Sequence, residues 1–242
     1  MRAPILPPRI NTVIASFGGV GTTSLLTHLA NHTSCNDPLD ADGLKHTPLP
    51  PMTLRKDVRF VYLFGEPLLA VVSLFRRNFQ HGHSRKLQRY QSDAVGPIPP
   101  KQSLSDYAAE GVERFGLERH FENWYATFQV HHTLFIRYEA LHDHLDTLAD
   151  FLELPHTVFD TFPPHTPRQS TLTGLSLETQ DGLKHLYGAF AARLEGLDDV
   201  VIKGRASAKE MRACYHSDAY WHNIKHNFRE TKKNAQVKNE RS

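Results

Sequence analysis

Residues 11–26, NTVIASFGGVGTTSLL, join a short apolar run to a helical pattern through a glycine-rich turn. The run from Asn11 to Phe17 is rich in β-branched residues, which predicts a buried strand. Three glycines follow within four positions, and the apolar residues after them recur with a helical period. The stretch therefore predicts a strand, a tight turn and a helix.

The turn is a candidate site for an anion. Glycines let the backbone approach a ligand closely, and the first N–H groups of a helix have no partner within the helix. Phosphate groups bind at such helix starts. The candidate phosphate-binding residues are Gly18, Gly19, Val20, Gly21, Thr22, Thr23 and Ser24. The threonine hydroxyls can bond to phosphate oxygens or simply cap the helix.

Two more strand and helix pairs follow along the chain. Residues 59–64, RFVYLF, predict a buried strand, and Pro67 suits the first turn of the helix after it. Residues 132–138 predict a third strand, and residues 139–152 have the apolar period of a helix. Alternating strands and helices predict an α/β protein, with a three-layer P-loop-type fold in which helices flank a central parallel sheet. Ligands are then expected outside the carboxyl ends of the strands.

The remaining segments are less regular. Residues 31–57 predict a loop that covers a site. The polar residues 79–103 predict an exposed segment that could serve as a lid. Aromatic residues at helical spacing predict one long helix over residues 104–128. We expect a single domain over residues 1–228 and a basic, disordered tail over residues 229–242.

Composition narrows the classes of function. The 242 residues, 40% hydrophobic, fit one domain with a sizeable core. The net charge is only +2, from 28 Lys and Arg against 26 Asp and Glu, so nothing favours nucleic acid as a partner. Cys35 and Cys214 lie far apart and fit neither a disulfide framework nor a metal site. We expect no bound metal.

No part of the sequence has the pattern of a signal peptide or of a membrane span. The first ten residues lack an apolar stretch, and no window approaches the roughly 20 apolar residues that a spanning helix needs. We therefore expect a soluble, cytoplasmic protein. The sequence leaves its oligomeric state open.

Three ordered segments resemble the sulfotransferases. SFGGVGTTSLL, from Ser16, is similar to the family's 5′-phosphosulfate-binding loop. VYLFGEPLLAVVSLFRR, from Val61, is similar to its 3′-phosphate-binding segment, and FIRYEALHDHLDTLADFLEL, from Phe135, is similar to its strand and helix with a Tyr-Glu-Asp sequence. KHTPLP at residues 45–50 and IKG at residues 202–204 are weaker matches to two further elements.

The resemblance implies a metal-independent enzyme that moves a sulfonate group from 3′-phosphoadenosine 5′-phosphosulfate (PAPS) to a hydroxyl or amine, leaving the bisphosphate PAP. It implies His46 as the catalytic base, with His81 and His83 as substitutes, and Lys45 as a positive charge near the sulfonate. The remaining cofactor-binding residues that it implies are Ser73, Tyr138, Lys203 and Gly204. The acceptor, a small molecule or a carbohydrate, is not identified by any pattern.

Two departures from the family pattern remove positive charge. Gly19 stands where the family has a lysine, and Gly65 stands where it has an arginine. Each lost contact to a phosphate costs about 1.5–3 kcal/mol. The cations available to replace them are Arg55, Lys56, Arg76, Arg77, Lys203 and Arg205.

Two other functions stay open from the sequence. A catalytically inactive relative would keep the nucleotide or partner site without the reaction. A nucleoside-triphosphate-binding protein is the other alternative, because GGVG resembles a deviant Walker loop, although Thr22 replaces its lysine.

Overall fold

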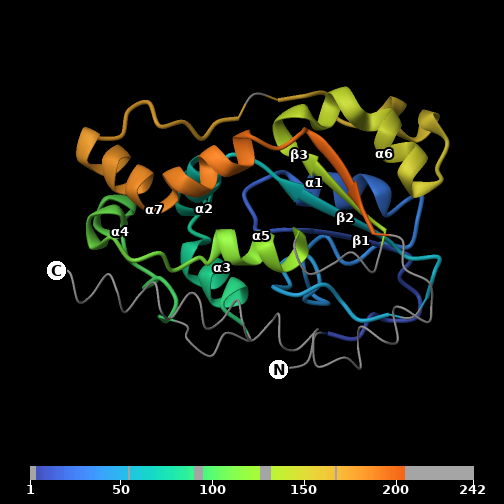
Figure 1. Ribbon diagram of the computed structural model, residues 1–242, viewed down its shortest axis with the longest axis horizontal. Helices are drawn as coiled ribbons and strands as arrows, with labels where there is room; N and C mark the ends of the chain where they lie inside the picture. Colours follow the sequence, from blue (N-terminus) through green and yellow to red (C-terminus); the bar gives the residue numbers. More distant parts are fainter. Residues whose placement is uncertain (1–3, 54, 90–94, 126–131, 167, 205–242) are drawn as a thin grey trace.

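The computed structural model describes residues 4–53, 55–89, 95–125, 132–166 and 168–204 (Figure 1). Its centre is one open, four-stranded sheet with the order β1-β2-β3-β4. The first three strands are parallel to one another, and the last is antiparallel to β3. The strands are β1 (Thr12–Ser16), β2 (Arg59–Phe64), β3 (Thr133–Arg137) and β4 (Val200–Lys203). The α/β prediction is confirmed, with a mostly parallel sheet.

Helices connect the strands and pack around them. They are α1 (Thr22–Leu29), α2 (Pro67–Arg76), α3 (Gln80–Leu87), α4 (Leu104–Glu110), α5 (Leu117–Tyr125), α6 (Leu145–Leu152) and α7 (Leu177–Glu195). Two 3₁₀ helices, η1 (Tyr138–His144) and η2 (His156–Thr161), flank α6. In the described part of the chain, no helix has the length and apolar character needed to span a bilayer.

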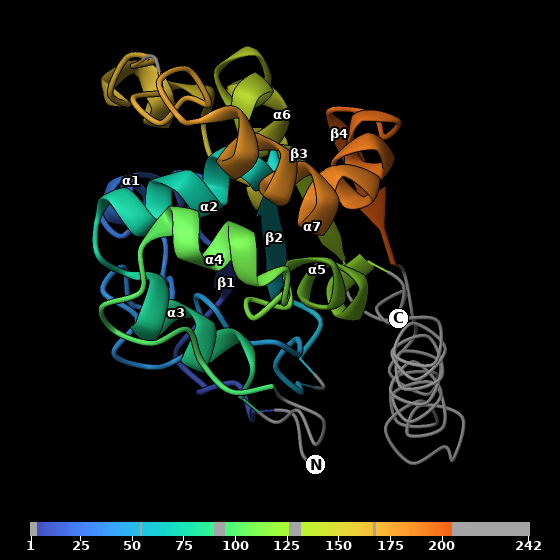
Figure 2. The same ribbon diagram turned by 90° about the vertical axis from the view of Figure 1, so that its left-hand side faces the viewer.

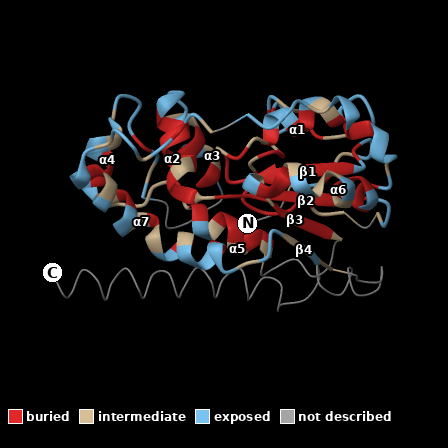
Figure 3. Cartoon of the chain, turned by 90° about the horizontal axis from the view of Figure 1, so that it is seen from above, coloured by how far each residue is buried: buried red, intermediate tan, exposed pale blue. Residues whose placement is uncertain are grey.

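Aromatic side chains form the core on one face of the sheet. Strands β1 and β3 are buried almost throughout, as is β2 (Figure 3). Alternate residues of a strand point to the same face of the sheet, and Tyr62 of β2 points towards α5. The centre of its ring lies 5.4 Å from that of Trp124 and 5.8 Å from that of Phe121, both on α5. These edge and tilted ring contacts fix α5 against the strands.

Helix α5 also anchors the loop that follows α1. The Trp124 indole N–H donates to the Thr47 carbonyl at 3.0 Å, and Asn123 donates to Pro48 at 3.0 Å. Farther back in that loop, the Asn36 side chain pairs with both backbone groups of Ile14 at the sheet edge. Residues 36–48 are therefore held beside β1, with Lys45 and His46 at its carboxyl end.

Two of our segment predictions are wrong. The expected helix over residues 104–128 is divided into α4 and α5, because Gly111 and Gly116 have positive φ values of 66° and 72°, which end one helix and precede the next. Residues 80–87 are no exposed lid but helix α3, which lies below α2 in Figures 1 and 2 and buries His83 and Leu87. The sequence did not indicate this packed helix, because its buried face is itself partly polar.

Helix α7 offers a test of this packing. It crosses α4 so closely that a Cβ on Gly182 would lie 2.6 Å from the Ala108 carbonyl oxygen, whereas a Cβ on Gly188 would meet nothing within 4 Å. Gly182→Ala should lower the free energy of unfolding by about 1–3 kcal/mol through overpacking. Gly188→Ala should raise it by up to about 1 kcal/mol through helix propensity. Urea unfolding of both variants measures this, and equal effects would contradict the described α4–α7 contact.

Candidate functional site

The loop between β1 and α1 is shaped by glycines whose backbone conformations and close neighbours disfavour any side chain. Gly18, Gly19 and Gly21 have φ values of 93°, 73° and 71°, which residues other than glycine rarely adopt. Neighbours also occupy the space that side chains would need. A Cβ on Gly18 would lie 2.1 Å from Nε2 of His83, and one on Gly21 would lie 2.3 Å from the Tyr138 ring. The loop is therefore clamped between residues of α3 and η1.

Basic side chains bind the loop's carbonyl groups. Each comes from a different segment, and each donates to a different oxygen. The three hydrogen bonds run from His46 Nδ1 to Ser16 at 3.0 Å, from His83 Nε2 to Phe17 at 2.8 Å and from Arg168 Nη2 to Gly19 at 3.2 Å. Because carbonyls can only accept, the histidine nitrogens in these contacts carry the protons.

With these carbonyls tied to the protein, the loop's amides remain available. The Gly18 amide donates to Ser16 Oγ at 3.1 Å. Within the described part of the chain, none of the five following amides, from Gly19 to Thr23, donates to an acceptor. They lie at the start of α1, where the helix dipole favours negative charge. The arrangement is suited to an anion such as a phosphate.

The two threonines of the loop have different roles. Thr22 is buried, and its hydroxyl lies 2.7 Å from that of Ser16, so it closes the loop from inside. Thr23 is exposed, and its hydroxyl accepts a hydrogen bond from the Lys45 ammonium at 3.1 Å. Val20 is buried and Ser24 is exposed. Of these side chains, Thr23 and Ser24 are therefore the ones open to a ligand.

Lys45 brings a buried ammonium to the start of α1. Its backbone carbonyl accepts from the Ser16 amide at 3.1 Å, and its ammonium donates to the Pro38 carbonyl at 2.5 Å. Burial lowers the pKa of Lys45, and the nearby Asp40 carboxylate opposes that shift. The side chain is 7% exposed, so it is positioned by the fold rather than free in solvent.

Three more cations lie near Lys45 or the loop. Arg77 interacts electrostatically with Lys45, and burial lowers the pKa of its guanidinium. Lys86 of α3 is also close to Lys45 and forms an ion pair with Asp40 at 2.6 Å. The third is Arg168, which donates to the Gly19 carbonyl and also interacts electrostatically with Arg77. The loop thus lies among positive charges from several elements.

Arg168 links the loop to the end of β3. Its guanidinium lies 4.9 Å from the centre of the Tyr138 ring and 3.3 Å from the Glu139 carboxylate. The Tyr138 ring in turn covers Gly21. The structure therefore brings Tyr138 to the glycine loop, together with an arginine that we did not predict. No pattern in the sequence around Arg168 pointed to it, because it follows an irregular, proline-rich segment.

Two neutral histidines lie together beneath the loop. The His46 and His83 rings are 4.4 Å apart, and burial lowers the pKa of both, that of His83 to about 4. Because Nδ1 of His46 carries the proton, its lone pair is on Nε2. His46 is partly exposed, and Nε2 is the ring nitrogen left to accept a proton. His81 instead bonds to the Ile98 carbonyl and is not brought to the loop.

The predicted 3′-phosphate segment lies next to the loop, but an acidic residue rather than a basic one stands at its helix start. Ala70 of α2 contacts Gly19, and Ser73 is buried one turn farther along, next to Arg77. At the helix start, the Glu66 carboxylate accepts from the amides of Leu68 and Leu69. Helix α2 is therefore capped by its own acid, which fills the place where an anion would otherwise bind.

Some predicted residues are not brought to the loop. Lys203 pairs with Thr133 at the start of β3, so it and Gly204 lie at the opposite end of the sheet. Its ammonium donates to the Tyr125 carbonyl and lies 3.3 Å from the centre of that ring. Arg55 binds the carbonyl of Ile10, at the start of β1, and Lys56 precedes β2. Arg205 and the predicted tail lie outside the described residues.

Comparisons with known proteins give no family. The chain matches no protein-family model, no curated protein and no solved structure. Within the described residues, no three histidine, cysteine, aspartate or glutamate side chains are grouped as metal ligands. The site must therefore be interpreted from its own geometry.

The His83 clamp predicts a pH dependence of stability. Its pKa is about 4 in the folded chain and near 6.5 when unfolded, so the unfolded chain binds the proton first as the pH falls. The stabilisation is complete above pH 6.5 and is lost towards pH 4. Glutamine can keep the donor to Phe17 without titrating, and His83→Gln should remove this dependence.

Urea unfolding at pH 7.5 and pH 5.5 measures the effect. Over this interval the wild-type chain should lose about 1 kcal/mol more of its free energy of unfolding than the variant does. All other titrating groups are common to both proteins and cancel in the difference. Equal losses would show that His83 is not held neutral by burial.

Proposed function

We propose that the chain binds PAPS with the 5′-phosphosulfate at the glycine loop and transfers its sulfonate to a hydroxyl or amine. In this proposal the sheet and its helices form the three-layer arrangement of P-loop proteins. The observation that carries it is the row of five amides from Gly19 to Thr23 without an acceptor among the described residues. Lys45 and Arg168 are bonded to the loop, and Arg77 interacts electrostatically with both. The three ordered sequence segments favour this nucleotide over others.

The geometry accounts for the missing family lysine. A Cβ at Gly19 would lie 2.8 Å from both Cα and the carbonyl oxygen of Ala70, so α2 leaves no space for a side chain there. A cation must come from elsewhere, and the Lys45 ammonium is hydrogen-bonded to Thr23 at the edge of the same loop. Lys45 is therefore our candidate for the charge that stabilises the leaving phosphate.

At the position of the missing arginine the neighbour is a carboxylate. A Cβ at Gly65 would lie 2.8 Å from the Glu139 carboxylate and 3.2 Å from Val20. Because Glu66 already caps the start of α2, we assign the 3′-phosphate to two other cations, Arg77 at the far end of α2 and Arg168. Arg168 donates to the Gly19 carbonyl of the loop, Arg77 interacts electrostatically with Arg168 and Lys45, and each guanidinium has several donors.

The chain's own groups suffice for the transfer. The acceptor oxygen or nitrogen attacks sulfur as the bond between sulfur and the 5′-phosphate oxygen breaks, and PAP leaves. His46 Nε2 takes the acceptor's proton, since its other nitrogen is committed to Ser16. The amides of the loop and Lys45 hold the negative charge that grows on the 5′-phosphate.

Nucleotide titration tests the binding step. PAP should raise the melting temperature, whereas ATP with Mg²⁺ should not. Lys45→Gln should weaken PAP binding about 10- to 100-fold, because one charge-assisted contact to phosphate is lost. Lys56→Gln is the matched control, since Lys56 is exposed near the other end of β2 and should bind PAP normally. Stabilisation by ATP with Mg²⁺ alone would favour the nucleoside-triphosphate alternative.

Sulfonate transfer tests the chemistry. Asparagine at position 46 can keep the donor to Ser16 but offers no basic nitrogen, so His46→Asn should bind PAP normally. Its transfer of labelled sulfonate to a panel of acceptors should fall about 100- to 10,000-fold. PAP binding with no transfer by the wild-type chain would instead favour the inactive relative.

A further inference from the structure

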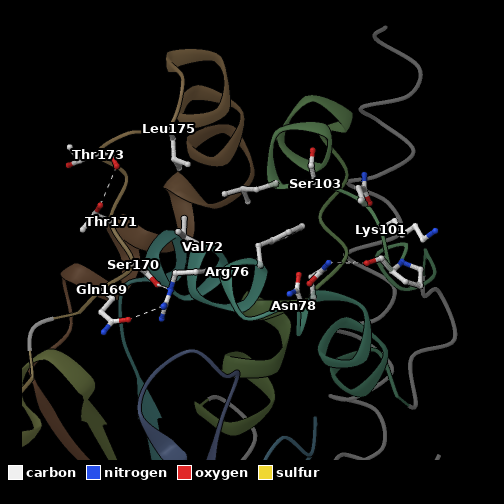
Figure 4. A pocket seen from close by; sticks show the side chains of 15 residues that line it. Val72, Arg76, Asn78, Lys101, Ser103, Gln169, Ser170, Thr171, Thr173 and Leu175 are labelled. Carbon is white, nitrogen blue, oxygen red and sulfur yellow. Dashed lines mark hydrogen bonds between the residues drawn. The ribbon is translucent and has the colours of Figure 1, made fainter.

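A cavity lies away from the glycine loop, at the end of α2. Its walls are the end of α2, the segment that leads into α4 and residues 169–175 before α7 (Figure 4). Its volume is about 580 Å³, within the roughly 300–1,000 Å³ typical of small-molecule sites. The proposed nucleotide function makes no use of this cavity.

The walls are mainly polar. Side-chain amides come from Asn78, Gln80, Gln102 and Gln169, and hydroxyls come from Ser170 and Thr173. Amides and hydroxyls both donate and accept hydrogen bonds, as the hydroxyl groups of a sugar do. The apolar residues Phe75 and Leu175 add a surface on which C–H groups can pack. Such a mixture favours a polyhydroxylated ligand over a purely apolar one.

Two wall glutamines have unused acceptors. Gln80 is 4% exposed, and its amide nitrogen donates to the Pro100 carbonyl at 3.2 Å, while its oxygen has no partner among the described residues. Gln102 donates to Glu110 at 2.8 Å, and its oxygen is likewise buried without a partner. A buried acceptor left unpaired costs about 1–3 kcal/mol. A ligand hydroxyl that donates to either oxygen would remove that cost.

Arg76 supplies a positive charge to one wall. Its Nη1 donates to Gln169 at 2.9 Å and its Nε lies 3.4 Å from Ser170 Oγ, so the guanidinium is held in place (Figure 4). Nη2 has no partner among the described residues and remains available to an anion. No carboxylate lines the described cavity. Lys101 lies on the opposite rim, and its side chain points outward in Figure 4.

From these walls we infer a binding site for a small, hydroxyl-rich anion of the sugar-acid class. The carboxylate pairs with Arg76, and the ring hydroxyls bond to the amides of Gln80, Gln102 and Gln169. The site goes beyond the proposed function and stands without it.

Glucuronate is the probe, with glucose and acetate as controls for the two halves of the ligand. Calorimetric titration of the full chain should give millimolar binding of glucuronate and at least tenfold weaker binding of either control. Arg76→Gln should weaken glucuronate binding at least tenfold, the loss of one charge-assisted hydrogen bond. Lys101→Gln removes the same charge from the rim and should change binding less than threefold.

The outcomes separate this site from the nucleotide site. No binding of glucuronate at millimolar concentrations, equal binding of glucose, or unchanged binding by Arg76→Gln would overturn the inference. Competition between PAP and glucuronate would also overturn it, because the cavity would then belong to the nucleotide. Failure of PAP to bind, with glucuronate bound as expected, would refute the proposed function and leave this site intact. Circular dichroism of both variants confirms that they fold.

Discussion

The attachment of the glycine loop's carbonyls to His46, His83 and Arg168 is the constraint on which the site depends. A backbone loop has as many acceptors as donors, and unrestrained peptide units can turn either group outward. Here the protein supplies donors for the oxygens, so the amides are left for a ligand. The donors come from three separate segments, which means that the loop's conformation requires most of the fold.

The same constraint explains why charges surround the loop rather than occupy it. Gly19 is packed so tightly that a side chain would collide with the backbone of Ala70, and at Gly65 a side chain would displace the Glu139 carboxylate. Tight packing at Gly19 leaves no space for a lysine within the loop. Positive charge is brought by Lys45, Arg77 and Arg168 from outside. In this arrangement the glycines determine shape, and residues distant in sequence determine charge.

The local elements of the fold could be predicted from the sequence, but the contacts between them could not. Apolar runs and glycines identified β1, the loop and α1, because these signals act over a few residues. Helix α3 was missed, since its buried face includes His83 and Ser84 rather than apolar residues alone. Lys45 and Tyr138 were predicted through a resemblance, and both lie at the loop. Arg168 could not be found, because only tertiary packing brings it to Gly19.

Amide chemical shifts test the central claim most directly. In a ¹H–¹⁵N spectrum of the labelled chain titrated with PAP, the amides from Gly19 to Thr23 should shift strongly to low field as they gain an anionic acceptor. The amide of Gly188, on α7, should remain unchanged. Saturation with PAP that shifts other amides and leaves these five in place would contradict the account.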